Sequence, residues 1–223
     1  MKRKQTETTA PRRKPGRPMG GSVTADTRQR IIDAAIGCFA RDGYAKASNK
    51  TIAAEAGVTA ASLYHYFDSK ATLYLSALQM GNAVLVDAYR SACAELPEAS
   101  SMEQLCLGIE KVIALSRRYP GLMTFGAASA GEIERHEDLD WLDAKDADAF
   151  PAFFRELLLR ARRRGELGRG INIEAAAQML IACISGLAAL HGTPVATKDF
   201  ASVLRAFERM LSGELMLSKI RSA

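Results

Sequence analysis

Apolar residues recur along this chain at the spacing of helices, not at the two-residue spacing of a half-buried strand. Ile31, Ala35, Cys38 and Phe39, for example, fall at positions i, i+4, i+7 and i+8, which places them on one face of a helix. Comparable helical patterns continue beyond residue 73, with no internal repeat of fixed period. We therefore predict an all-α protein of roughly nine or ten helices.

The N-terminal third contains start and stop signals for three short helices. The first is predicted from about residue 25 to 42 and ends at Gly43, because glycine is favoured just past a helix end. Ser48 and Thr59 are typical N-cap residues, so each predicts the start of a further short helix. Gly57 and Val58 would form the turn between these two helices, which gives a helix-turn-helix arrangement.

The third helix is predicted to expose aromatic side chains. Leu63 and Phe67 are four residues apart and are expected to face the core, which leaves Tyr64, His65 and Tyr66 over the remaining surface. The helix begins with small residues, which can approach base edges closely, whereas Tyr and His can reach phosphates. This pattern suits a helix in the DNA major groove; the alternative is that the three rings only pack, half-buried, around a short helix.

Longer helices are predicted beyond residue 73. Asp68 is expected to cap a fourth helix that ends before Pro97, and the next helix should cover about 101–118. Residues 122–133 form a short apolar segment. Pro151 marks the start or a bend of a long helix, since proline is tolerated only in a first turn or at a kink.

Positive charge is concentrated at the N-terminus. Residues 1–20 carry seven basic residues against one acidic residue, while the chain as a whole has a net charge of +5. Residues 1–23 have almost nothing to bury, so we predict a disordered basic arm. A polyanion is the expected partner, nucleic acid before an anionic membrane. Arg17 lies in a Gly-Arg-Pro sequence similar to the core of an AT-hook; the alternative is an arm that binds phosphates without sequence preference.

Composition argues against several other classes of protein. We expect no membrane span, which needs an apolar run of ~18 to 20 residues, and we recognise no secretory signal, so a cytoplasmic protein is expected. The four cysteines lack the spacing of a zinc or redox motif, which makes buried thiols the expectation and a redox sensor the alternative. The acidic residues around His136 match no calcium loop and predict a solvated loop that repels DNA. We find no P-loop, nucleophile elbow or histidine pair, and so predict no enzyme, cofactor or metal.

Residues 27–74 resemble the DNA-binding domain of the TetR/AcrR family of transcriptional regulators. The matching positions are Ile31, Ala34, Ala35 and Phe39, then Gly43 and Tyr44, then Ile52, Ala53, Ala56, Gly57 and Val58, then Leu63, Tyr64, Tyr66 and Phe67, then Ser69 and Lys70. One departure is Tyr66, where many relatives have His, with His65 one residue earlier. The resemblance implies a homodimer, each subunit having a three-helix DNA-binding domain and a larger helical body that binds a small molecule.

The resemblance also implies which residues contact DNA. Ser48, Lys50 and Lys70 would meet or lie near phosphates, Thr59, Ala60 and Ser62 would lie near bases, and Tyr64, His65 and Tyr66 would reach both.

In the body, residues that could wall an apolar ligand site are Cys106, Met123, Phe125, Trp141, Phe150, Phe154, Met179 and Cys183. The helix near 150–164 and the apolar helix after it resemble the family's dimer-forming pair, with Leu158, Ala182, Ser185, Gly186 and Ala189 as candidate interface residues.

These observations predict four regions: a basic arm (1–23), a helix-turn-helix domain (24–73), a ligand-binding and dimerisation domain (74–216) and a C-terminal tail (217–223). The predicted function is a dimeric DNA-binding regulator, most simply a repressor, that leaves a pseudo-palindromic operator when a small apolar effector binds. Two alternatives stay open. One is an architectural DNA-binding protein that uses the arm and no ligand, and the other is a redox switch through Cys93, Cys106 or Cys183.

Overall fold

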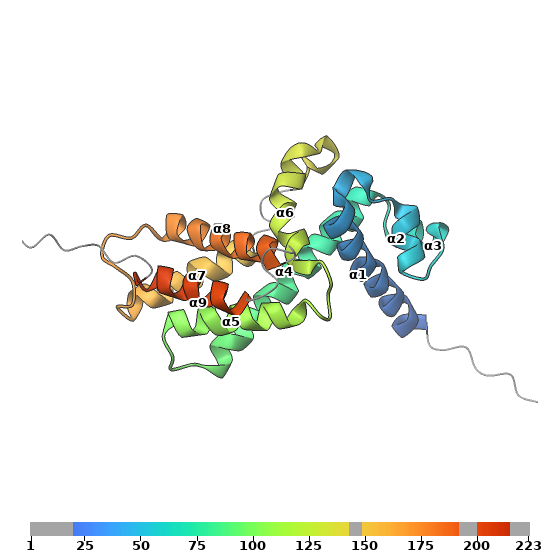
Figure 1. Cartoon of the computed structure of the whole chain (residues 1–223). Helices are drawn as coiled ribbons and strands as arrows, with labels where there is room; N and C mark the ends of the chain where they lie inside the picture. The colour runs from blue at the N-terminus through green and yellow to red at the C-terminus, as the bar shows by residue number, and fades with distance from the viewer. Residues whose placement is uncertain (1–19, 143–148, 192–199, 215–223) are drawn as a thin grey trace, which may run out of the picture.

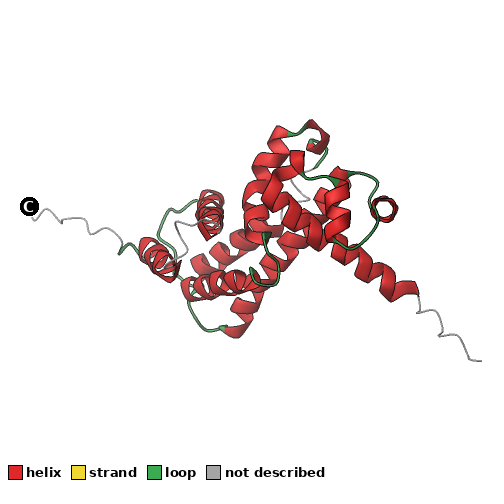
Figure 2. Ribbon diagram, turned by 45° about the vertical axis from the view of Figure 1, so that its right-hand side comes forward, coloured by secondary structure: helices red, strands yellow, loops and turns green. Residues whose placement is uncertain are grey.

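The computed structural model describes residues 20–142, 149–191 and 200–214, which form helices and connecting loops without a strand (Figure 2). In chain order the described helices are α1 (Gly20–Lys46), α2 (Asn49–Glu55), α3 (Ala60–Tyr66), α4 (Lys70–Glu95), α5 (Ser101–Leu115), α6 (Leu122–Arg135), the 3-10 helix η1 (Glu137–Leu139), α7 (Ala149–Arg163), α8 (Ile173–His191) and α9 (Phe200–Leu211). The small unit of α1 to α3 lies at one end of the molecule, and α4 runs from it into the larger body (Figure 1).

Helix α1 begins earlier than the sequence pattern predicts. Its first residue is Gly20, so residues 20–23 are helical and do not belong to an extended arm; the rest of the predicted arm lies outside the described residues. The predicted stop at Gly43 is confirmed as a break, because this residue has φ +73° and separates the main helix from a last turn that ends at Lys46.

The two short helices are capped as predicted. The Ser48 and Thr59 side chains accept hydrogen bonds from the backbone N–H groups of Thr51 and Ser62, which satisfies free donors at the starts of α2 and α3. Gly57 takes the left-handed conformation in the turn between them. The three helices share a core in which Ile31, Ile52 and Leu63 are fully buried.

Helix α4 is capped by Ser69, so the prediction that Asp68 caps it was wrong. Ser69 accepts from the backbone N–H of Thr72, and the Thr72 side chain accepts in return from the Ser69 backbone N–H, which makes a reciprocal capping box. The helix ends before Pro97, as predicted. Its middle is buried on most sides, and it contacts α1, α5, α6 and α7.

The body contains more helix than the pattern predicts. Residues 122–135 form the complete helix α6, where only a short apolar segment was expected, while α5 ends at Leu115, before the predicted limit of residue 118. Helix α7 begins at Ala149 with Pro151 in its first turn, which agrees with the proline rule. Three arginines lie in its last turn, where the helix dipole favours positive charge.

Helix α8 corrects the expectation about apolar runs. Within the described ranges, the window 173–190 is long and apolar enough to cross a bilayer by length and composition, with a mean hydropathy of 1.8. A core helix of a globular protein passes the same test, and a third of this window is buried against the rest of the chain. The helix packs on α6 and α7.

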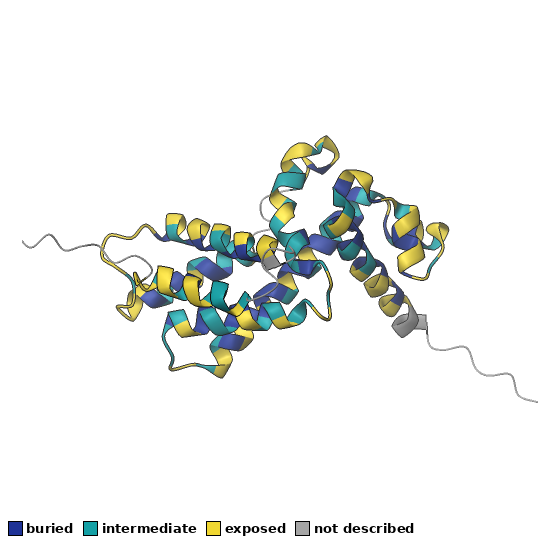
Figure 3. Cartoon of the chain, viewed as in Figure 1, coloured by how far each residue is buried: buried dark blue, intermediate teal, exposed yellow. Residues whose placement is uncertain are grey.

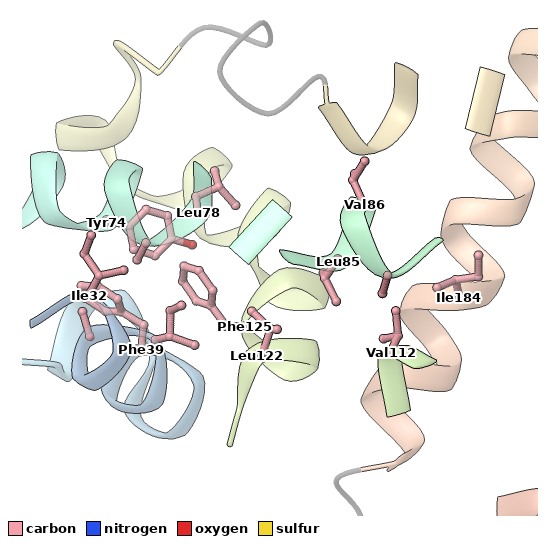
Figure 4. Close-up of a cluster of buried hydrophobic side chains, with 14 of the residues drawn as sticks. Ile32, Phe39, Tyr74, Leu78, Leu85, Val86, Val112, Leu122, Phe125 and Ile184 are labelled. Atoms are coloured by element: carbon pink, nitrogen blue, oxygen red, sulfur yellow. The ribbon is translucent and has the colours of Figure 1, made fainter. Parts of the chain in front are cut away.

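An aromatic cluster joins the small unit to the body. Phe39 of α1, Tyr74 of α4 and Phe125 of α6 have ring centroids 5.0 to 6.0 Å apart. Figure 4 shows the three rings packed together, with Ile32 and Leu122 beside them. The small unit therefore shares a continuous core with α4 and α6.

Candidate DNA-binding surface and effector cavity

The described residues expected to contact DNA lie at the N-caps of α2 and α3, along these two helices and at the start of α4. Ser48, Lys50, Thr59, Ala60, Tyr64 and His65 are exposed, whereas Ser62, Tyr66 and Lys70 are partly buried. Figure 3 shows exposed positions along both helices at this end of the molecule. Among the described residues of this unit, Tyr64 is the most exposed large hydrophobic residue, at 54% exposure. Arg17 lies outside the described residues.

The surroundings of His65 and Tyr66 differ. His65 is exposed, while Tyr66 is half-buried and packs against the core, with the two ring centroids 5.5 Å apart in an edge-to-face arrangement. Hence the histidine is the more accessible of the two rings. The alternative in which all three rings are half-buried packing is wrong for Tyr64 and His65.

Lys70 has an intramolecular role that the sequence did not reveal. Its ammonium group donates hydrogen bonds to the carbonyl oxygens of Tyr44 (2.8 Å) and Ala45 (3.3 Å), and it lies 4.3 Å from the centroid of the Tyr44 ring. The lysine therefore ties the start of α4 to the end of α1. Its predicted phosphate contact stays a prediction.

A polar junction connects the end of α1 to the end of α6. The backbone N–H of Tyr44 donates to the Glu132 carboxylate (3.1 Å), and the Tyr44 hydroxyl donates to the Asp138 carboxylate. Glu132 also pairs with Arg135 (3.0 Å) and lies 3.2 Å from His136 Nε2. We call these five residues the α1–α6 junction. They correct the expectation of a simple solvated acidic loop, because two of its carboxylates hold the small unit of α1 to α3 to the body.

The junction raises the pKa of the Tyr44 phenol above its ordinary value. Burial is the main cause, and the hydrogen bond to the Asp138 carboxylate adds to it. The phenol therefore remains a proton donor at neutral pH. Local sequence patterns do not reveal the junction, because Tyr44 lies 88 and 94 positions from its partners Glu132 and Asp138.

A cavity of about 210 Å³ lies inside the body. It is lined by Leu78, Asn82, Leu85, Tyr89, Ile109, Val112, Ile113, Met123, Gly126, Ala127, Ser129, Ala130, Phe150, Pro151, Ile181, Ile184, Ser185, Leu187, Ala188 and Phe200. Leu85, Val112 and Ile184 converge on one region from α4, α5 and α8 (Figure 4). A mostly apolar wall with a few polar groups is typical of a small-molecule site.

Only two of the eight predicted ligand residues, Met123 and Phe150, line this cavity. Phe125 and Phe154 are buried in neighbouring core instead, and Trp141 is 52% exposed, with its indole N–H donating to the Asp138 carbonyl (2.8 Å). Cys106, Met179 and Cys183 do not line the cavity either. Composition identified which residues of the body are apolar. Only the packing of the helices decides which of these residues line the cavity and which are buried in the core.

The predicted interface residues also divide into two groups. Ala182, Gly186 and Ala189 are exposed on one side of α8, and Met179, at 65% exposure, is on the same helix. Leu158 is buried within its own subunit, so its assignment to a dimer interface was wrong. It lines a second hollow between α5, α7 and α8. Ser185 is partly buried and lines the cavity described above.

All four cysteines are free thiols. Burial raises the pKa of Cys38 to about 11 and that of Cys106 to about 12, so both remain protonated and poorly reactive at neutral pH. Cys93 accepts a hydrogen bond from Arg160 (3.3 Å). Burial thus weakens the redox alternative at Cys106.

Comparison with known proteins agrees with this architecture. Residues 31–77 match the family model for bacterial regulatory proteins of the tetR family. The transcriptional regulator UidR of Escherichia coli K12, a protein of the helix-turn-helix type, is 25% identical over 195 residues, which cover 86% of this chain and 94% of UidR.

Two solved structures have the same fold. The fatty acid degradation regulator FadR from Bacillus halodurans has a TM-score of 0.69 at 22% identity, with 84% of this chain and 99% of that chain covered. FadR from Bacillus subtilis, solved in complex with stearoyl-CoA, has a TM-score of 0.67 at 20% identity, with the same coverage. The predicted all-α fold with an N-terminal helix-turn-helix domain is confirmed.

Proposed function

Because the chain belongs to the TetR family of bacterial regulatory proteins, and is thus a DNA-binding transcriptional regulator and not an enzyme, we propose that it is an effector-released repressor. Two copies would bind a pseudo-palindromic operator, with one α3 helix from each in successive major grooves about 34 to 36 Å apart. A small, largely apolar molecule would occupy the cavity and lower the affinity for DNA.

The continuity of α4 is the observation that carries this proposal. The helix starts at Lys70, beside the recognition surface, and its residues Leu78, Asn82, Leu85 and Tyr89 line the cavity. A ligand therefore touches the same helix that supports the DNA-binding unit. A ligand that favours a position of α4 unsuited to DNA would weaken DNA binding, and DNA would then weaken ligand binding by the same factor.

The recognition surface would work through two kinds of contact. Thr59, Ala60 and Ser62 would lie near base edges, because small side chains allow close approach. The residues proposed to meet phosphates are Ser48, Lys50, Tyr64, His65, Tyr66 and Lys70, with Arg17 adding a contact from the arm. The capping hydroxyl of Thr59 accepts a bond from the protein and can still donate one to DNA. The Ser48 hydroxyl also contacts Thr51 Oγ1 (2.9 Å) and can donate to DNA when Thr51 is the donor in that contact.

The size of the cavity favours a small effector. A cavity of about 150 Å³ can hold benzene, so about 210 Å³ suits a molecule somewhat larger than a single ring. The stearoyl-CoA bound by Bacillus subtilis FadR is far larger. We therefore expect a compact apolar effector here, and long-chain acyl-CoA serves as the comparison ligand.

The exposed side of α8 is the proposed dimer interface. Ala182, Gly186 and Ala189 recur at helical spacing and have small side chains, so a second α8 could approach closely along this strip. We assign DNA binding to residues 24–73 and effector binding and dimerisation to residues 74–216. A regulator of this class acts on chromosomal DNA, which implies a cytoplasmic location.

Selection of DNA from a random pool by the full chain, at near-physiological salt, tests the proposal. Enrichment of a two-fold-symmetric site supports a dimer that reads sequence and provides a probe for an effector screen. Enrichment of A·T tracts without symmetry would favour the architectural alternative, in which the basic arm dominates. Loss of binding under oxidant, with escape by Cys93→Ala or Cys183→Ala, would favour the redox alternative.

A further inference from the structure

The polar side chains in the cavity wall differ in what they can offer a ligand. Among the described residues, four with polar side chains line the cavity: Asn82, Tyr89, Ser129 and Ser185. The Ser129 hydroxyl already donates to the Gly126 carbonyl (2.8 Å), and the Tyr89 hydroxyl is enclosed by packing, with almost no surface that a ligand could reach. Asn82 and Ser185 are therefore the two side chains whose polar atoms remain available.

Asn82 lies on the side of α4 that faces the cavity. It follows Leu78 by four residues and precedes Tyr89 by seven, so the three side chains form one row along the helix, and all three line the cavity. The exposed residues of the same stretch, Ala83 and Asp87, lie on another side of α4. The small accessible surface that Asn82 retains, 9% of the residue, therefore faces the cavity.

The Asn82 amide makes no hydrogen bond with the described residues. Unlike the hydroxyls of Tyr74 and Tyr89, which also lack a partner, its oxygen and nitrogen both keep accessible surface, so a molecule in the cavity can reach them. A serine hydroxyl in a helix, such as that of Ser185, can bond to a carbonyl of its own helix. An asparagine amide needs both a donor and an acceptor, which makes Asn82 the stronger candidate for a ligand contact.

The wall offers no partner to a charged group. The described residues that line the cavity include no Asp, Glu, Lys, Arg or His, so a charged ligand would lose its hydration without gaining an ionic contact. An uncharged carboxamide matches both ends of the Asn82 side chain, because its N–H donates to the amide oxygen and its carbonyl accepts from the amide N–H. This match is the same whichever way the Asn82 amide is turned.

We propose that the cavity selects small uncharged molecules that carry a carboxamide, or a similar adjacent donor and acceptor, on an apolar body of about one ring, and that this group pairs with the Asn82 amide. The inference rests on the proposed function in treating the ligand as an effector. Binding itself, however, is measured on the free protein. Because Asn82 belongs to α4, the pairing would act on the helix that supports the DNA-binding unit.

The test uses three uncharged probes of similar size. Benzamide has a donor and an acceptor, acetophenone has only an acceptor, and α-methylstyrene has neither. Calorimetry measures their affinities for the wild-type chain, for Asn82→Leu, which keeps the branched shape without polar atoms, and for Asn82→Ala, which cannot overpack the cavity. Ser129→Ala is the matched control, because it also removes a polar group from the wall, but one already bonded within the protein.

We expect the ratio of benzamide affinity to α-methylstyrene affinity to fall at least about tenfold in both Asn82 variants, because each loses the hydrogen bonds to the carboxamide. The corresponding ratio for acetophenone should fall less, and Ser129→Ala should leave both ratios unchanged. Benzoate, which has the shape of benzamide and a charge, should bind the wild type more weakly than benzamide. In nuclear magnetic resonance spectra, the Asn82 side-chain NH₂ signals should move more with benzamide than with α-methylstyrene.

Three results would overturn the inference. They are a benzamide ratio that is unchanged in the Asn82 variants, benzoate binding that equals benzamide binding, and the absence of saturable benzamide binding by the wild type. Failure of the proposed function is distinguishable, since it would appear as benzamide binding that leaves DNA affinity unchanged. Conversely, release from DNA by a cavity ligand whose affinity is the same in Asn82→Leu would sustain the function and refute this inference.

Discussion

At the scale of single residues, exposure separates side chains that can meet DNA from those that hold the fold. Tyr64 and Lys50 are exposed, whereas Lys70 is partly buried and bonded to the end of α1. The sequence resemblance assigns all three to DNA, but their substitutions should have different effects. Measuring stability beside DNA affinity therefore distinguishes the two roles.

Tyr64→Ala should lower operator affinity by roughly tenfold to a hundredfold, because it removes one contact to a charged phosphate worth about 1.5 to 3 kcal/mol. The free energy of unfolding should change by less than about 0.5 kcal/mol, since the side chain is mostly exposed. Fluorescence anisotropy with the selected site measures the affinity. Met210→Ala, at an exposed position on α9, is the control, and unchanged binding by Tyr64→Ala would refute the assignment of α3 as the recognition helix.

Lys70→Ala should lower the free energy of unfolding by about 1 to 2 kcal/mol, because two carbonyl oxygens of α1 lose their charged donor. Lys50→Ala should weaken DNA binding with little effect on stability, since Lys50 is exposed. Urea unfolding of both variants provides the comparison. Equal stability of the two variants would argue against a structural role for Lys70.

At the scale of helices, close approach depends on glycine at particular positions. Gly108 of α5 lies against the Tyr89 ring of α4, whereas Gly37 of α1 has no atom within 4 Å of an added methyl carbon. Both residues are helical, so their intrinsic preferences are the same. Their different surroundings predict opposite effects of the same substitution.

Gly108→Ala should destabilise the protein by about 1 to 3 kcal/mol, because overpacking displaces the Tyr89 ring and exceeds the gain in helix propensity. Gly37→Ala should stabilise it by up to about 1 kcal/mol, since only the propensity changes. Thermal unfolding measures both. A stabilising effect of Gly108→Ala would show that the α4–α5 contact is looser than the packing implies.

At the scale of the whole molecule, α6 connects the cavity to the DNA-binding unit. Met123 and Gly126 line the cavity near the start of this helix, and Glu132 bonds to Tyr44 near its end. Together with α4, it provides a physical route by which a ligand could bias the position of α1 to α3. The shared aromatic core gives the two parts a continuous packed contact.

Tyr44→Phe should reduce the factor by which the effector weakens DNA binding, because it removes the hydroxyl bond to Asp138 while keeping the ring. Typical coupling factors are about 5 to 150, and we expect a loss of several-fold. DNA affinity is measured with and without a compound from the effector screen. Tyr74→Phe, which leaves the α1–α6 junction intact, is the control, and an unchanged factor in Tyr44→Phe would exclude the hydroxyl from the coupling.

Gly186→Arg should convert a dimer into monomers, because a long charged side chain would stand in the middle of the exposed strip on α8. Operator affinity should then fall at least tenfold, since each monomer reads only one half-site. Sedimentation velocity measures the oligomeric state. The control is Ala94→Arg, at an exposed position of α4, which should leave the oligomeric state unchanged. If Gly186→Arg still forms dimers, the interface lies elsewhere.

The sequence by itself determined the features that depend on neighbouring residues. Helical periodicity, the glycine break at residue 43 and the caps Ser48 and Thr59 each involve groups within about one helical turn, so local spacing was sufficient. Tertiary structure decided the rest. The α1–α6 junction joins residues 88 to 94 positions apart, and the pairing of Lys70 with α1 spans 26 positions. Phe150 and Phe154 lie on the same helix, yet only the first lines the cavity, because that depends on how several helices pack around a shared space.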